Sequence, residues 1–200
     1  MIFNNVNNLL NKSLNTIIIG SGPAGITVAK KLEKKKISSL IIEAGPMKSS
    51  SVSQEEYEGQ VIGDDYIDIS ASRLRQFGGT VNHWGGVCHP LEEHDFNKWP
   101  IKKKDLDSYT DETMQILNLS GNFNVTKFNS SFNIISTKQS NVNFGKKYYN
   151  EFKISRYIDI ISNCSLENLN FENNQISSVD IFKEKKKYTL KSKYYVLACG

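Results

Sequence analysis

Residues 16–43, TIIIGSGPAGITVAKKLEKKKISSLIIE, decide the fold of this 200-residue chain. A short apolar strand runs into a G-x-G-x-x-G turn, a helix follows, and a second apolar strand ends in an acidic residue. In such a unit Gly20 allows a tight turn, Gly22 lets the backbone approach a pyrophosphate, and Gly25 lets the helix pack closely on the strand. This order of elements predicts a Rossmann-like α/β fold that binds a dinucleotide.

The start of the predicted helix supplies the phosphate-binding groups. Ser21 and Ala24 flank Pro23, whose fixed φ suits the first helical turn. Unpaired backbone N–H groups at this positive end of the helix dipole hold two phosphate charges without a lysine in the turn. Glu43 is expected to accept hydrogen bonds from both ribose hydroxyls, which disfavours a 2′-phosphate. Because FAD and NAD share the adenosine diphosphate half, this unit does not choose between them.

A second glycine-rich segment, GGTVNHWGG at residues 78–86, bears on that choice. The pair Gly78 and Gly79 lets a backbone pass close to a flat ring. Asn82 and His83 supply donors of the kind that poise a flavin near N1 and N5. The alternative interpretation is an ordinary glycine-rich turn in which the histidine packs on its neighbour Trp84.

Residues 73–109 resemble the signature stretch of the glucose/methanol/choline (GMC) family of FAD-dependent oxidoreductases, and most closely its sugar and sugar-acid dehydrogenase branch. The likeness rests on an arginine-containing lead-in, the glycine pair, a few small residues and then His-Trp. It extends to EAG at 43–45 and to YYVLACG at 194–200. It covers nearly the whole chain, with poor matches at 46–70 and 119–145.

The resemblance implies FAD as the cofactor. In several relatives the histidine at the place of His83 is joined covalently to the flavin, so covalent and non-covalent attachment are both open here. Leu166 stands where family members pair their backbone with the adenine. Together, the motifs and the resemblance give these candidate cofactor-binding residues: Gly20, Ser21, Gly22, Pro23, Ala24, Gly25, Glu43, Ala44, Arg75, Gly78, Gly79, Thr80, Asn82, His83, Trp84, Leu166, Ala198 and Gly200.

The implied function is that of the N-terminal, FAD-binding part of an oxidoreductase. Such an enzyme oxidises CH–OH groups of sugars, sugar acids or related alcohols by hydride transfer to flavin N5. The family's catalytic pair, a histidine with a second histidine or asparagine, belongs to a C-terminal half that is missing here. We therefore expect no catalytic residue in this chain and no activity from it alone.

Two alternatives of other classes stay open. One is a short protein that binds FAD or another adenine nucleotide without turnover, or a half-site subunit that a partner chain completes. The other is a nicotinamide-dependent dehydrogenase or a different flavoprotein, which fits the glycine triplet and Glu43 but not GGTVNHWGG.

The chain divides into four predicted segments. They are a polar N-terminal extension at 1–15, a Rossmann unit with the flavin-facing segment at 16–118, a partial substrate-domain segment at 119–146, and the continued FAD-binding domain at 147–200. A helix near 103–118 is expected to carry a core stripe of Leu106, Tyr109, Met114 and Leu117. Strands at 157–161 and 194–198 complete the predicted parallel sheet, and a β-meander at 165–192 is expected as an insertion between them.

Composition excludes several classes of protein. The chain has 38% hydrophobic and 23% charged residues, as soluble globular proteins do. Its net charge of +4 comes from lysine clusters with only three arginines, so nucleic-acid binding is not expected. Cys88, Cys164 and Cys199 form no C-x-x-C motif, and with the histidines they show no metal-ligand spacing. Free thiols, no signal peptide and no membrane span predict a cytoplasmic protein. The small-molecule alcohol or sugar expected as its substrate is implied by the resemblance.

Overall fold

The computed structural model describes residues 1–3, 5–10 and 12–199, which form two compact units. The sheet unit combines Met1–His83 with Asn143–Gly200. The hairpin unit is Trp84–Val142. The chain therefore leaves the sheet unit once, builds the hairpin unit, and returns.

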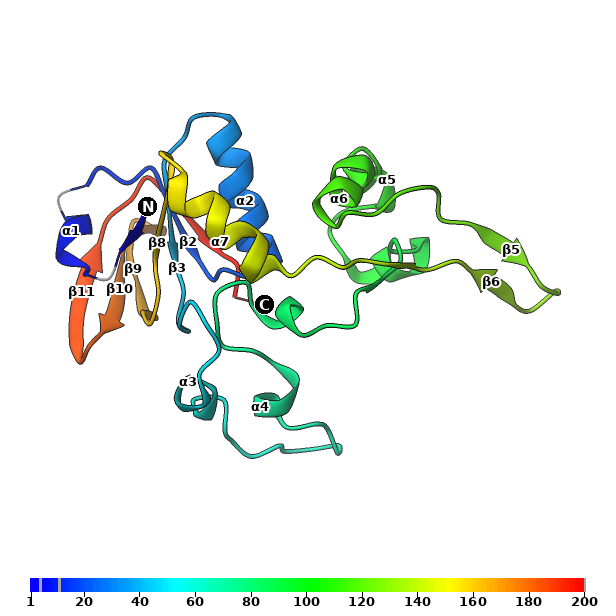
Figure 1. Cartoon of the computed structure of the whole chain (residues 1–200), viewed down its shortest axis with the longest axis horizontal. Coiled ribbons are helices and arrows are strands. Elements are labelled where there is room, and N and C mark those ends of the chain that lie inside the picture. The colour runs from blue at the N-terminus through cyan, green and yellow to red at the C-terminus, as the bar shows by residue number, and fades with distance from the viewer. Residues whose placement is uncertain (4, 11, 200) are drawn as a thin grey trace. The chain divides into compact units, whose positions relative to one another are not determined.

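A five-stranded parallel sheet is the centre of the sheet unit (Figure 1). In spatial order its strands are β1 (Ile2–Phe3), β8 (Ile158–Ile161), β3 (Ser39–Ile42), β2 (Thr16–Ile19) and β12 (Tyr194–Leu197). The chain runs outward from β2 through β3 to β8 on one side, and β12 lies on the other side. The strand order thus reverses beside β2, and ligands bind at such a point in open parallel sheets. The predicted Rossmann-like α/β fold is confirmed.

Helices cover one face of this sheet. In Figure 1, α2 (Pro23–Lys34) and α7 (Phe144–Ile154) lie side by side, and Lys30 Nζ of α2 is 2.6 Å from Glu151 Oε2 of α7. Ile26 and Phe152 of the two helices are fully buried. α2 runs antiparallel to β2, which it follows, and α7 runs antiparallel to β8, which it precedes. The N-termini of both helices therefore point to the carboxyl edge of the sheet.

A β-meander covers the other face. It consists of β9 (Ser165–Glu172), β10 (Gln175–Lys183) and β11 (Lys186–Leu190), all antiparallel, as the sequence predicted. Ile17 and Ile19 of β2 share a buried cluster with Val179 and Ile181 of β10. Because helices bury one face and the meander the other, the central strands are apolar at nearly every position.

The first 15 residues, set apart in sequence as a polar extension, contribute to the sheet unit. β1 pairs with β8 in parallel, and α1 (Asn7–Leu10) follows it. Phe3, Val6, Leu9 and Leu14 are buried in the same cluster as the meander side chains. The asparagines between them had hidden this apolar spacing.

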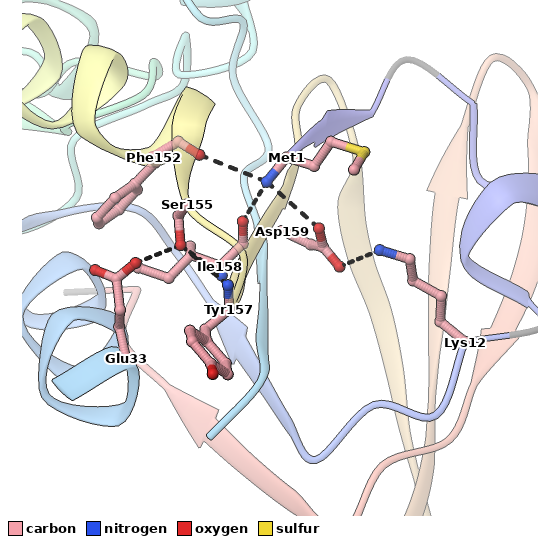
Figure 2. A network of polar contacts seen from close by, with 8 residues as sticks. All are labelled: Met1, Lys12, Glu33, Phe152, Ser155, Tyr157, Ile158 and Asp159. Carbon is pink, nitrogen blue, oxygen red and sulfur yellow. Dashed lines mark hydrogen bonds and ion pairs between the residues drawn. The ribbon is translucent and has the colours of Figure 1, made fainter. Parts of the chain in front are cut away.

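Polar contacts hold the start of the chain against β8 (Figure 2). The Met1 ammonium donates to the carbonyl oxygens of Ile158 and Phe152 and lies 3.4 Å from Asp159 Oδ1. Lys12 Nζ lies 2.7 Å from Asp159 Oδ2. One carboxylate therefore joins two cations at the outer edge of the sheet.

A second set of hydrogen bonds in the same view joins α2 to the loop after α7 (Figure 2). Ser155 Oγ donates to Glu33 and accepts from the backbone N–H groups of Tyr157 and Ile158 at 3.1 and 3.0 Å. The hydroxyl therefore fixes the turn that leads from α7 into β8.

Short elements build the hairpin unit. It contains two antiparallel strand pairs: β4 (Val87–Cys88) with β7 (Lys138–Gln139), and β5 (Val125–Lys127) with β6 (Asn133–Ile135). Its helices are η2 (Glu93–Lys98), α5 (Lys103–Asp107) and α6 (Thr110–Ile116). The sheet unit adds α3 (Ser51–Glu55), α4 (Ile69–Ser72) and η1 (Thr80–Asn82). Across the described ranges, no helix combines the length and apolar character needed to cross a bilayer.

The predicted single helix near 103–118 is two helices, α5 and α6. Residues between them, including Ser108, are weak helix formers, and a turn interrupts the helix there. The prediction of a core stripe is also wrong, because Leu106 and Tyr109 are exposed. With Met114 and Leu117 they line an open cavity instead.

The buried Cys164 gives a test of the core. Burial raises the pKa of its thiol to about 12, against a smaller lowering by Lys183. At pH 8 only about one Cys164 in ten thousand is then a thiolate, which is the reactive form. We expect iodoacetamide to label the exposed Cys199 at least about 100-fold faster than Cys164 in the folded chain, as read by peptide mass spectrometry. Urea should abolish the difference, and equal rates without urea would contradict the burial.

Candidate functional site

The glycine-rich turn leaves β2 at the carboxyl edge of the sheet. Gly20 has a φ of +98°, and a Cβ there would lie 2.5 Å from the carbonyl oxygen of Ala198 at the end of β12. A Cβ on Gly25 would lie 2.0 Å from the carbonyl oxygen of Gly20. A Cβ on Gly22 would meet nothing within 4 Å. Packing therefore requires two of the three glycines, while Gly22 faces open space.

The N-terminus of α2 presents backbone donors beside Gly22. Gly22 is the N-cap residue, Pro23 follows it at the first helical position, and Ala24 is exposed. No side chain among the described residues caps this helix. Uncapped N–H groups together with the positive end of a helix dipole form a ready site for phosphate.

Glu43 is turned toward the glycine-rich turn. Its Oε2 accepts from the backbone N–H and the hydroxyl of Ser21 at 3.0 and 2.6 Å, and its Oε1 accepts from the Gly45 N–H at 2.7 Å. The residue is only 7% exposed. A carboxylate has about four acceptor positions, so the protein itself uses three of them. This differs from the predicted arrangement, because at most one position is left for a ribose hydroxyl.

Ser21 joins three segments of the site. It is fully buried, and its hydroxyl donates to Glu43 while accepting from the Gly78 N–H at 3.1 Å. Gly78 and Gly79 have φ values of +90° and +66°, and a Cβ on Gly79 would lie 3.2 Å from the Cα of Gly22. The glycine pair therefore lies directly against the glycine-rich turn, which brings the two sequence motifs together.

Asn82 and His83 have different environments at the end of η1. The Asn82 carboxamide donates to the carbonyl oxygen of Phe77 at 2.7 Å and accepts from the Gly145 N–H at 2.8 Å. It fixes η1 against the start of α7, whereas the sequence predicted a donor toward a flavin. His83 is exposed, and its backbone N–H donates to the Thr80 carbonyl oxygen at 3.1 Å.

Arg75 and Thr80 support the loop before the glycine pair. The Arg75 guanidinium donates to Ser53 Oγ at 2.9 Å and to Ser165 Oγ at 3.2 Å, so it bridges α3 and the start of β9. Thr80 Oγ1 accepts from the Leu74 N–H at 3.1 Å. Both side chains hold protein segments in place.

The remaining predicted contacts are dispersed. Ala44 follows Glu43 and is partly buried, and the Ala198 N–H donates to the Ile19 carbonyl oxygen at 2.8 Å. Leu166 packs its side chain against the core cluster. Trp84 belongs to the hairpin unit, where its Nε1 donates to the Val142 carbonyl oxygen at 3.3 Å. Gly200 lies outside the described residues.

Two further glycines of the site, Gly45 and Gly145, were not predicted from the sequence. Gly45 donates to Glu43, and a Cβ there would lie 2.2 Å from the Arg75 carbonyl oxygen. At Gly145 a Cβ would lie 2.7 Å from the Phe77 carbonyl oxygen. The EAG motif was a signal for Gly45, but no local pattern indicates Gly145, since its neighbours are distant in sequence.

The strand order and the glycine-rich turn define a dinucleotide-type α/β fold. Pyridoxine 4-oxidase from Mesorbium loti has a similar structure, with a TM-score of 0.60, 15% identity, 94% of this chain covered and 50% of that chain. This chain thus spans about half the length of that protein. The likeness at this identity establishes the fold.

Two other solved structures are more distantly similar. A myxobacterial chondrochloren halogenase, an FAD-dependent halogenase, has a TM-score of 0.47, 13% identity, and covers 94% of this chain with 38% of its own. The glycerol-3-phosphate dehydrogenase from Bacillus halodurans, complexed with FAD, has a TM-score of 0.47, 14% identity, and coverage of 98% and 36%. No protein-family model and no curated protein matches the sequence.

Gly25 is required for close packing and Gly22 is not, and a pair of alanine variants tests this difference in stability. Gly25→Ala places a methyl group against the Gly20 carbonyl oxygen and should lower the free energy of unfolding by about 3 kcal/mol. Gly22→Ala meets open space and should cost about 1 kcal/mol or less, the usual penalty for alanine at an N-cap. Urea unfolding followed by circular dichroism measures both. Equal losses would contradict the geometry.

The hydrogen bonds of Glu43 give a second test. Glu43→Ala leaves the buried N–H groups of Ser21 and Gly45 unpaired, so the free energy of unfolding should fall by about 3 kcal/mol. Glu55→Ala, at an exposed position in α3, is the matched control and should change it by less than about 0.5 kcal/mol. Urea unfolding reads both variants, and a change at Glu43 as small as the control rules out a structural role.

Proposed function

We propose that this chain binds FAD and forms the N-terminal, FAD-binding part of an oxidoreductase of the GMC type. One observation carries the proposal: the uncapped N-terminus of α2 lies directly beside the Gly78–Gly79 pair. Phosphate-binding donors and a backbone that tolerates a flat ring are thereby combined in one place. The resemblance of residues 73–109 to the GMC signature and the fold shared with an oxidase support it.

The residues present fit the adenosine diphosphate half of FAD. The backbone N–H groups at Gly22 and Ala24 would hold the pyrophosphate, and Ser21 with Glu43 would fix the turn that presents them. The remaining acceptor position on Glu43 Oε1 would serve one ribose hydroxyl. The predicted hydrogen bonding to both hydroxyls is thus reduced to one.

The flavin end of the site would lie near the glycine pair and His83. The exposed imidazole is not held by the contacts that hold Asn82, and this exposure supports His83 as the side chain that would contact the ring or be joined to it covalently. Bound beside these residues, FAD would supply the hydride acceptor for oxidation of a CH–OH group. The substrate class we propose, sugars, sugar acids or related alcohols, follows from the resemblance alone.

Catalysis also needs a base that accepts the alcohol proton. The family's catalytic histidine pair has no matching residues in this sequence. A further part of a longer protein, or a partner chain, would supply it. The chain alone would bind the cofactor without turning over a substrate.

Titration with FAD tests the proposal. FAD should bind the chain with quenching of its fluorescence, and Gly22→Ala should weaken binding about 30-fold by keeping phosphate away from the helix amides. Ile62→Ser, at an exposed site in the sheet unit, should leave the affinity unchanged. Binding of NADH without FAD would favour the nicotinamide alternative, and binding of neither would end the proposal.

The mode of attachment is tested separately at His83. Intact mass after denaturation distinguishes a covalent flavin, which adds the mass of FAD, from a flavin lost wholly to the supernatant. If the bond exists, His83→Ala should remove the added mass. Turnover with an artificial electron acceptor would separate an enzyme from a binding module, and we expect none from this chain alone.

A further inference from the structure

A cavity of about 430 Å³ lies at the start of α7 in the sheet unit. It is bounded by the loop at 47–49, by Gln76 with Phe77, and by the side of α7 that runs to Asn150. Most of its lining side chains are polar or positively charged. Its size is in the range of cavities that enclose small molecules.

The Gly78–Gly79 pair lies between this cavity and the glycine-rich turn. A Cβ on Gly79 would lie 3.2 Å from the Gly22 Cα, whereas a Cβ on Gly78 would lie 2.4 Å from the nitrogen of Gly145, which lines the cavity. None of the residues of the turn lines it. The cavity is therefore separate from the phosphate site proposed at α2.

Two lysines bring positive charge to the cavity. Lys48 lies in the loop after β3, Lys146 lies in the first turn of α7, and both side chains are exposed and line the cavity. Within the part of the chain that the structure describes, neither lysine side chain has an ion-pair or hydrogen-bond partner, and no acidic residue lines the cavity. Both charges are therefore available to an anion.

The start of α7 adds to this positive charge. The helix has 11 residues, and the positive end of its dipole lies at the cavity. Two of its first amides are already used, because Asn143 Oδ1 accepts from the Lys146 N–H at 2.8 Å and Asn82 Oδ1 accepts from the Gly145 N–H at 2.8 Å. The lysine ammonium groups are therefore the main donors left for an anion.

Gln76 supplies an independent indication of a ligand. Its side-chain oxygen Oε1 is closed off from solvent and has no hydrogen-bond partner among the described residues. Buried carboxamide oxygens are nearly always hydrogen-bonded in folded proteins. Because Gln76 lines the cavity, a hydroxyl group of a bound molecule can donate the missing hydrogen bond.

We infer that this cavity binds a small phosphate monoester that carries hydroxyl groups, such as a phosphorylated polyol. A phosphate monoester has a charge close to −2 at neutral pH, which matches Lys48 and Lys146, whereas a carboxylate would engage one charge only. A hydroxyl group on the same molecule pairs with the carboxamide of Gln76. The inference does not depend on the binding of FAD, because it uses none of the residues proposed to hold the pyrophosphate.

An NMR titration of the ¹⁵N-labelled 200-residue chain with glucitol 6-phosphate tests the inference. The probe should shift the amide signals of residues 47–49 and 143–150 in a saturable way. The double variant Lys48→Gln with Lys146→Gln should raise the dissociation constant about 30-fold or more, because it removes both charge-assisted contacts. Lys153→Gln, at an exposed position of α7 outside the cavity, is the matched control and should leave the affinity unchanged. All of these lysines are exposed, so the remaining signals should report an unchanged fold.

Two further probes separate the charge from the hydroxyl groups. Hexyl phosphate has the same charge and chain length without hydroxyl groups, and it should bind at least about tenfold more weakly because the Gln76 oxygen stays unpaired. Gln76→Leu should remove most of this difference between the two phosphates. Glucitol, which has no charge, should not bind.

Four results would overturn the inference. They are no saturable shifts with glucitol 6-phosphate, shifts confined to residues 20–27, an affinity unaffected by the double lysine variant, and equal affinities for the two phosphates in the wild-type chain.

Discussion

The hydrogen bonds between the Glu43 carboxylate and Ser21 tie the end of β3 to the glycine-rich turn, and the site is arranged around them. Because the serine hydroxyl donates to this carboxylate at 2.6 Å, its lone pairs are directed to the Gly78 N–H. The second glycine-rich segment is thereby held against the first. Removal of this buried contact would release the turn, the EAG loop and the glycine pair together.

This contact separates the polar groups that the protein uses from those left for a ligand. Most hydrogen bonds of the site's polar side chains go to other segments of the chain, as at Glu43, Ser21 and Asn82. Among the described residues of the site, the N-terminus of α2 has no side-chain cap and His83 is exposed, so both are open to a ligand. Positioning and binding are therefore divided between different residues, although the sequence motif contains both kinds.

The central fold could be predicted from local sequence rules. The predictions were wrong or incomplete at residues whose environment is set by tertiary contacts. The turn glycines Gly20 and Gly25 obey steric requirements that a sequence displays directly. The orientation of Glu43 depends on which donors reach it, and Gly45 and Gly145 matter because distant backbone passes close to them. The predicted stripe of Leu106, Tyr109, Met114 and Leu117 lines one cavity although two helices carry it, and periodicity does not reveal whether such side chains are covered. The asparagine-rich start concealed β1 because two residues of strand carry almost no pattern.

We propose that the open amides at the start of α2 receive the phosphates of FAD. Hydrogen–deuterium exchange of the 200-residue chain, with and without FAD, tests this most directly at residues 20–27. FAD should slow exchange of the peptide covering these amides at least about tenfold and leave exchange of the β5–β6 hairpin unchanged. Binding of FAD with no added protection of residues 20–27 would contradict it.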